Sequence, residues 1–212
     1  TCALPIYFLD HGWKVIATMR TPREDVLPRS EHLRVLALDV TDADSIRQAV
    51  EAAGPIDVLV NNAGIGLLGA VEGISMDMAR QIFETNTFGT IAMTQAVLPQ
   101  FRLRQAGVVV NVSSSVTLKS LPLLSVYTAS KAAVNAFTES LALELQAFNV
   151  RVQAQHLVVV VAGVEDAVFD HAGGRSNQGE GVRVVAALVA RDVEHAAQAA
   201  VGRHDGDRST GQ

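Results

Sequence analysis

The sequence predicts an α/β fold in which a doubly wound parallel sheet is covered by helices on both faces. Strand-like and helix-like stretches alternate along most of the chain, and this is the pattern of repeated β-α-β units. Several strand-like stretches are short and continuously apolar, which is typical of strands buried on both faces. Hydrophobic residues make up 49% of the 212 residues and charged residues 18%, so the chain can bury a large core.

Composition excludes several classes of protein. A net charge of -5 gives no electrostatic footprint for nucleic acid or an anionic membrane. Cys2 is the only cysteine, which excludes a disulfide framework and a thiolate metal site, and the six histidines lack the spacing of metal ligands. No apolar run approaches the roughly 18 residues that span a bilayer, and the N-terminus does not read as a signal peptide. We therefore expect a cytoplasmic protein without a metal.

The first half of the chain predicts the end of a helix, three strands and one further helix. The last turns of a helix fit residues 4–11, and Gly12 follows in the position of a left-handed C-cap. Thr41 is expected to cap a helix over 42–53, which Gly54-Pro55 stops. The strands are expected at 14–19, 33–38 and 56–60.

The second half continues the alternation and then loses it. A helical pattern over 75–105 is expected to break near Thr85-Asn86 and again near Pro99. After Gly163 the pattern degrades, and only residues 190–201 predict a further helix. Between these regions we expect a buried strand at 107–112, a long helix over 125–148 and a strand at 150–161.

Tyr127 and Lys131 are the pair with the clearest chemical potential. In the predicted helix they are i and i+4 neighbours and share one face. A tyrosine titrates near ~10, so it transfers protons poorly at neutral pH unless a nearby cation favours its phenolate. Lys131 would supply that cation. On spacing alone, an ordinary amphipathic helix with a solvated lysine explains the pair equally well.

Four separated motifs follow one another along the chain. They are Asp39 after the second strand, Asn61-Asn62-Ala63-Gly64, Asn86 in the next helix, and Ser114 with Tyr127-x-x-x-Lys131. Ser114 precedes Tyr127 by 13 residues. Over residues 4–152 the chain thereby resembles the classical short-chain dehydrogenases/reductases, whose members share that interval. The resemblance implies a Rossmann-like, three-layer α/β/α domain.

The resemblance also implies a reaction, namely hydride transfer between a nicotinamide cofactor and a carbonyl or secondary alcohol. Tyr127 would exchange a proton with the substrate oxygen, while Lys131 would lower the pKa of Tyr127 and hydrogen-bond the nicotinamide ribose. Ser114 would donate to the carbonyl oxygen, where negative charge develops. Asn86 would hold a water that links Lys131 to solvent, or would be a structural residue at a helix kink. Spacing alone selects Ser114 over its neighbours Ser113 and Ser115.

Arg20, just past the first visible strand, decides the expected cofactor. Enzymes that use NAD place a carboxylate at such a strand end, and here Met19 and Arg20 stand there instead. A guanidinium suits a 2′-phosphate, so we expect NADP rather than NAD, with help from Arg23; an exposed arginine without a ligand is the other explanation. The resemblance adds further cofactor-binding residues, namely Asp39 at the adenine ring with Val40 beside it, then Asn61, Ala63 and Gly64 against the cofactor or the central strands, and Tyr127 and Lys131 at the nicotinamide.

Two features depart from the family pattern. The family opens with a strand and a glycine-rich turn that holds the pyrophosphate, whereas residues 1–11 match only the end of the first helix. We therefore expect one domain over 1–212 that is an N-terminally truncated fragment, with two strands left unpaired around the missing one and weak or absent cofactor binding. After about residue 152 the sequence is degenerate, and Gly163 is the only counterpart of the family's Pro-Gly turn.

Two functions stay open. The first is an NADP-dependent oxidoreductase; the second is a truncated or non-catalytic Rossmann-like module with impaired cofactor binding. The substrate pocket would be built from residues 65–71, 116–124 and the C-terminal region. Its leucines indicate a hydrophobic small-molecule substrate such as a steroid, retinoid or fatty derivative, or else pack internally: Leu67, Leu68, Leu118, Leu121, Leu123 and Leu124. Family members associate through the helices that carry Asn86 and Tyr127, so a homodimer or a homotetramer stays open.

Overall fold

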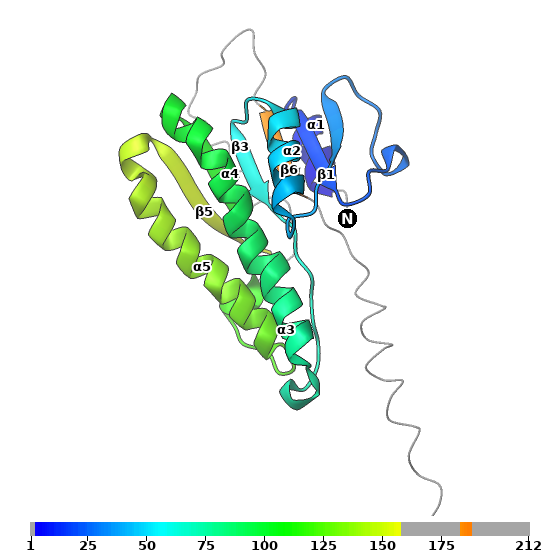
Figure 1. Cartoon of the computed structure of the whole chain (residues 1–212), viewed down its shortest axis with the longest axis vertical. Coiled ribbons are helices and arrows are strands. Elements are labelled where there is room, and N and C mark those ends of the chain that lie inside the picture. The colour runs from blue at the N-terminus through cyan, green and yellow to red at the C-terminus, as the bar shows by residue number, and fades with distance from the viewer. Residues whose placement is uncertain (1–2, 158–182, 188–212) are drawn as a thin grey trace, which may run out of the picture.

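A computed structural model of the chain describes residues 3–157 and 183–187 and shows a parallel sheet packed between helices (Figure 1). Within these residues the strand order is β2-β1-β6-β3-β4-β5, and every neighbouring pair is parallel. The strand predicted at 14–19 is confirmed at both ends. The strands are β1 Lys14–Met19, β2 Leu33–Ala37, β3 Val58–Asn61, β4 Gly107–Ser114, β5 Val150–Leu157 and β6 Arg183–Ala187.

The helices cover both faces of the sheet, as the three-layer α/β/α prediction requires. The α-helices are α1 Ala3–Asp10, α2 Ala43–Ala53, α3 Met76–Phe83, α4 Gly89–Arg104 and α5 Ser125–Leu145. A larger core lies between the sheet and α2, α4 and α5, which Figure 1 shows in front of the strands. A second core joins α1 to the opposite face. Successive strand residues alternate between the two cores: Val58 and Val60 pack with α1, and Leu59 packs with α4 and α5.

The ends of two helices test the capping predictions. Gly12 has φ +80°, which confirms the predicted left-handed cap after α1. Asp42, and not Thr41, is the N-cap of α2, because the Asp42 carboxylate accepts hydrogen bonds from the backbone amides of Asp44 and Ser45. Thr41 instead donates both its amide and its hydroxyl hydrogen to the Asp39 carboxylate. The prediction that Thr41 caps this helix was wrong.

The helical region over 76–104 is interrupted once. A single π-helical segment, Glu84–Phe88, separates α3 from α4 and contains the predicted break near Thr85-Asn86. The second predicted break, near Pro99, does not occur, because α4 continues through Pro99 to Arg104. Tertiary packing compensates for the hydrogen bond that proline cannot donate, since Val97 and Phe101 on either side of it are fully buried.

The expectation that two strands around a missing central strand would be unpaired was wrong, because β6 pairs with both β1 and β3. This strand lies between β1 and β3, and Val185 pairs with Ile16 on one side and Leu59 on the other. The backbone groups that a missing central strand would expose are therefore bonded to a segment from near the C-terminal end of the chain. The sequence pattern did not predict a strand there, because glycine and arginine are frequent around residues 173–183.

The remaining sequence predictions for the C-terminal region lie outside the described residues. They are the last part of the strand at 150–161, Gly163 and the helix at 190–201. Among the residues that the structure describes, no helix is long and apolar enough to cross a membrane.

Candidate active site

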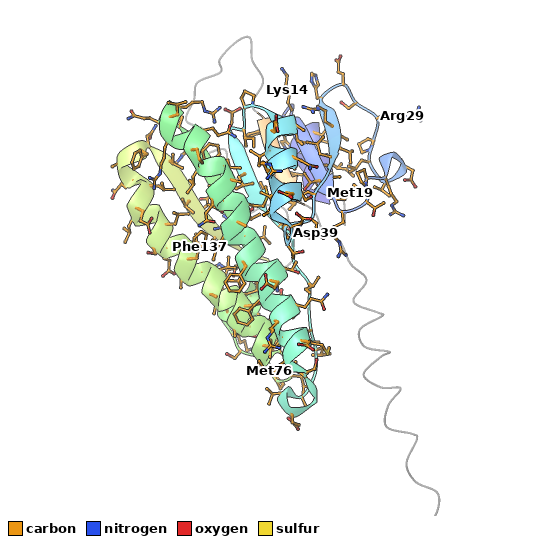
Figure 2. The ribbon with its side chains drawn as sticks, in the orientation of Figure 1. Lys14, Met19, Arg29, Asp39, Met76 and Phe137 are labelled. Carbon is orange, nitrogen blue, oxygen red and sulfur yellow. The ribbon has the colours of Figure 1, made fainter. Side chains whose placement is uncertain are left out.

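The carboxyl ends of the parallel strands bring the predicted site residues to one edge of the sheet. Arg20 follows β1, Asp39 follows β2, Asn61 ends β3 and Ser114 ends β4. In Figure 2 the labelled Met19 and Asp39 lie at this edge, and Lys14 at the start of β1 lies at the opposite one. Ligands of open α/β sheets bind in the crevice at the carboxyl edge, so this is the expected place for a cofactor.

A cavity of about 440 Å³ opens at this edge, and three of the predicted cofactor-binding residues line it. Arg20, Asp39 and Val40 line it on the sheet side, with Thr41 and Ile65 beside them. Three further lining residues come from the helical region before Asn86, and sequence reasoning missed them: Gln81, Glu84 and Thr85. Their position within one or two turns of Asn86 was the signal that could have found them.

Asp39 is held as a carboxylate at the rim of this cavity. The Thr41 hydroxyl donates to its Oδ1 at 2.7 Å and the Thr41 amide at 2.9 Å. These two hydrogen bonds lower the pKa of Asp39 below its ordinary value, and the nearby positive charge of Arg20 lowers it further. The cavity therefore presents an anion and a cation side by side, and both can hydrogen-bond the hydroxyl or phosphate groups of a nucleotide.

Asn86 is completely buried in the π-helical segment and fastens three elements together. Its side-chain Nδ2 donates to the carbonyl of Ile65 at 3.0 Å and to the hydroxyl of Ser130 at 3.1 Å, and its Oδ1 accepts from the amide of Ile65 at 2.8 Å. Ser130 in turn donates to the backbone carbonyl of Tyr127 at 2.7 Å. The loop after β3 and the start of α5 are thereby tied to the π-helical segment, which fits the structural role expected for Asn86; the role in holding a water stays a prediction.

Lys131 is a buried cation on the inner face of α5, with 5% of its surface exposed. Its Nζ donates to the backbone carbonyl of Val112 on β4 at 2.9 Å. Burial lowers the pKa of Lys131 from 10.5 to about 8, because the charged form loses its hydration. This excludes the solvated lysine that spacing alone left open.

Gly64 lies against the ammonium and the asparagine. A Cβ at Gly64 would stand 3.3 Å from Asn86 Oδ1 and 3.4 Å from Lys131 Nζ, which is tighter than most contacts of this kind. Glycine therefore lets the loop after β3 pass close to both polar side chains. Asn61 and Ala63 in the same run point into the interior, where the Asn61 amide donates to Thr94 and Asn111, so they stabilise the strands.

Ser114 and Tyr127 complete the predicted set. Ser114 ends β4, and its Oγ accepts a long hydrogen bond of 3.4 Å from the Val116 amide, which leaves the hydroxyl hydrogen to donate elsewhere. Ser113, its neighbour and rival, is 2% exposed, and its Oγ has no hydrogen-bond partner among the described residues. Tyr127 is half-buried on α5, one turn before Lys131.

The parallel sheet between two helical layers, with a cavity at its carboxyl edge, defines a Rossmann-like α/β/α fold. The family model described as short chain dehydrogenase matches residues 3–172. The chain belongs to this family of oxidoreductases, whose members depend on NAD(P).

Relatives and solved structures agree with this membership. The chain is 44% identical to an uncharacterized oxidoreductase of Bacillus subtilis (strain 168), over 67% of the chain and 55% of the relative. It is 40% identical to retinol dehydrogenase 8 of Bos taurus, over 65% of the chain and 47% of the relative. The chain therefore spans about half the length of these curated relatives.

Two solved structures carry cofactors. A 3-ketoacyl-(acyl-carrier-protein) reductase of Brucella melitensis, complexed with NADH, has a TM-score of 0.67 and 32% identity over 70% of the chain and 66% of that structure. A serine dehydrogenase complexed with NADP+ has a TM-score of 0.66 and 31% identity, over 71% of the chain and 64% of that structure. Relatives with this fold thus bind either nicotinamide cofactor.

Proposed function

We propose that this chain carries the site of an oxidoreductase that transfers a hydride between NADP(H) and a carbonyl or secondary alcohol, with Tyr127 as general acid/base. The observation that carries the proposal is the buried Lys131 ammonium, one helical turn from Tyr127 and hydrogen-bonded to the strand that ends in Ser114. A cation so placed would stabilise the negative charge that develops on the phenol oxygen as its proton is transferred.

The residues present fit parts of the nicotinamide cofactor. Arg20 and Asp39 would hold the adenosine end in the cavity of about 440 Å³, and Tyr127 and Lys131 would hold the nicotinamide ribose beside Gly64. When bound, the cofactor supplies or accepts the hydride.

The remaining chemistry belongs to the side chains. Ser114 would donate its hydroxyl hydrogen to the carbonyl oxygen of the substrate, because its Oγ already accepts from the Val116 amide. Tyr127 would give its phenolic proton to the same oxygen during reduction and take it back during oxidation. Asn86 would hold α5 against the loop after β3, so that Lys131 stays beside Gly64.

A hydrophobic substrate is favoured by the two loops that border the site. Gly69 donates its amide to the carbonyl of Leu123 at 2.9 Å, which joins the loops into one wall. Of the six leucines noted in these loops, Leu67 packs in the interior, whereas four are more than half exposed: Leu68, Leu118, Leu121 and Leu123. Exposed leucines at one rim suit a steroid, retinoid or fatty carbonyl compound.

The test is oxidation of NADPH by the full chain against a panel of hydrophobic ketones and aldehydes. We expect turnover that Tyr127→Phe reduces by at least about 100-fold, which is the contribution that general acid catalysis makes. Tyr7→Phe is the matched control, since Tyr7 lies on α1 at the other face of the sheet, and we expect it to retain activity. Turnover that survives Tyr127→Phe would overturn the role of Tyr127.

A non-catalytic module is the second candidate, and one observation favours it. β6 fills the position between β1 and β3, and the sequence that follows this strand, Leu188-Val189-Ala190, contains no glycine. Titration calorimetry with NADPH distinguishes the candidates. Binding together with turnover supports the enzyme, and the absence of both supports the module.

A further inference from the structure

A series of hydrogen bonds runs from Ser114 through Asn135 of α5 to His156 of β5. Ser114 leads directly into a short 3₁₀ turn, Ser115–Thr117, and the Thr117 hydroxyl donates back to the Ser114 carbonyl at 2.8 Å. The oxygen of that hydroxyl accepts from Asn135 Nδ2 at 3.0 Å. Asn135 Nδ2 also lies 3.3 Å from Nε2 of His156, a residue that β5 places opposite Ser113 in the strand register.

The donor and acceptor of each hydrogen bond in this series can be assigned in turn, starting at Ser114. The Thr117 hydroxyl has one hydrogen and gives it to a carbonyl, so Asn135 must be the donor to Thr117. This fixes the orientation of the amide, with Nδ2 toward both neighbours. Its second hydrogen then points at His156, whose Nε2 must accept it. A neutral His156 in this arrangement carries its proton on Nδ1.

The same helix face carries the reacting residues. Tyr127, Lys131 and Asn135 follow one another at intervals of four residues along α5. A movement of α5 relative to β4 would shift Tyr127 against Ser114, and the Asn135–Thr117 bond opposes such a movement. The Asn135 amide is thus well placed to keep the hydroxyl of Ser114 and the phenol of Tyr127 aligned.

We propose that Asn135, oriented by His156, is a positioning residue that holds Ser114 in its working geometry through Thr117. The proposal rests on the proposed function, in which Ser114 and Tyr127 act on one substrate oxygen. Asn135 and His156 do not contact the substrate in this role.

The kinetic test compares two substitutions at Thr117. Thr117→Val keeps the shape but removes the hydroxyl, and we expect kcat to fall by about 10- to 100-fold, the size of effect that a small misplacement produces. We expect the KM for NADPH to stay within about twofold, because the cofactor cavity is elsewhere. Thr117→Ser keeps the hydroxyl and should restore kcat to within about threefold. A Thr117→Val enzyme with unchanged kcat, or Thr117→Ser as impaired as Thr117→Val, would overturn the proposal.

A spectroscopic test does not depend on turnover and so separates this proposal from the proposed function. Long-range ¹H–¹⁵N spectra of the full chain, recorded near pH 8, report which imidazole nitrogen carries the proton. We expect an unprotonated Nε2 in His156 of the wild type and a changed ring signal in Asn135→Leu. Tyr127→Phe is the control and should leave that signal in place. A protonated Nε2 in the wild type would break the chain of bonds and refute the proposal, whatever the activity.

Discussion

At the scale of single residues, charge and burial decide what the site can do. Lys131 is a cation inside the protein, and Arg20 and Asp39 are opposite charges at the rim of one cavity. The spacing of Tyr127 and Lys131 could be recognised in the sequence, and so could the interval to Ser114. The burial of Lys131 could not, because it depends on how α5 packs on β4, and the wall contributed by Gln81, Glu84 and Thr85 needs the three-dimensional path of the helices.

Arg20→Asp tests the choice of cofactor. Removing a charged hydrogen-bond donor to a phosphate costs about 1.5–3 kcal/mol, so we expect the kcat/KM ratio of NADPH to NADH to fall by at least about tenfold. Arg29→Asp is the matched control, because Arg29 is exposed on the loop between β1 and β2 and does not line the cavity (Figure 2). An unchanged ratio in Arg20→Asp would exclude Arg20 as the residue that selects NADP.

Lys131→Met tests the cost of the buried cation. The pKa of Lys131 is about 8 in the folded protein and 10.5 when unperturbed, so between these pH values the unfolded chain binds more protons. Below pH 8 the buried Lys131 is charged, and its desolvation lowers the free energy of unfolding of the wild type by its full amount. As pH rises from about 8 to 10.5 the buried amine loses its proton, and this destabilising contribution disappears. Lys131→Met has no such cost.

We expect the free energy of unfolding of Lys131→Met, relative to the wild type, to decrease by about 3 kcal/mol between pH 7 and 10.5. The constant loss of the bond to Val112 does not affect this change with pH. Urea unfolding at several pH values measures it, and Lys119→Met, at an exposed lysine, should give a flat difference. A flat difference for Lys131→Met as well would mean that Lys131 is not desolvated.

At the scale of elements, the π-helical segment and α4 depend on close packing. The sequence pattern located the interruption near Asn86, because polar Thr85 and Asn86 interrupt an otherwise amphipathic helix. It placed a false break at Pro99, because the cost of a proline in a helix is local and the packing of Val97 and Phe101 is not visible in the pattern. Gly89 begins α4 directly against Val40.

Gly89→Ala tests that contact. A Cβ at Gly89 would stand 2.7 Å from Val40 Cγ2 and 3.2 Å from the Val40 carbonyl oxygen, so a backbone or a buried side chain must move. Alanine improves helix propensity by about 1 kcal/mol, but overpacking costs about 1–3 kcal/mol, and we expect a net loss of stability in urea unfolding. Gly73→Ala is the control, since a Cβ there meets no atom within 4 Å. The double variant Gly89→Ala/Val40→Ala tests whether the two residues are in contact. We expect it to lose less stability than the sum of the losses in the two single variants, because Val40→Ala makes room for the new Cβ. A loss equal to that sum would argue against the contact.

At the scale of the whole molecule, β6 joins two parts of the sheet. β2 and β1 form one part and β3, β4 and β5 the other, and within the described residues β6 is the strand that hydrogen-bonds to both. The fold class could be predicted because each β-α unit has its own local pattern. The partner of β1 and β3 could not, because strand pairing across the length of a chain leaves no local signal in the sequence.

Val185→Pro tests the position of β6. Proline removes a ladder hydrogen bond and is poorly tolerated in a central strand, so we expect a loss of about 3 kcal/mol or more in urea unfolding. Val185→Ile keeps the backbone amide and the β-branching and should unfold much closer to the wild-type midpoint than Val185→Pro. A Val185→Pro protein that unfolds at the wild-type midpoint would show that β6 does not pair with β1 and β3.

The place of β6 also sets the order in which the molecule can be assembled. Val185 pairs with Ile16, so the two contacting residues are far apart in the sequence. Contacts of such long sequence separation form late, because the entropy of closing the intervening loop is lost before any bond is gained. During synthesis β1 and β2 would leave the ribosome long before β6. We therefore expect slow folding, with a period in which the open edges of β1 and β3 are exposed to chaperones or to other copies of the chain.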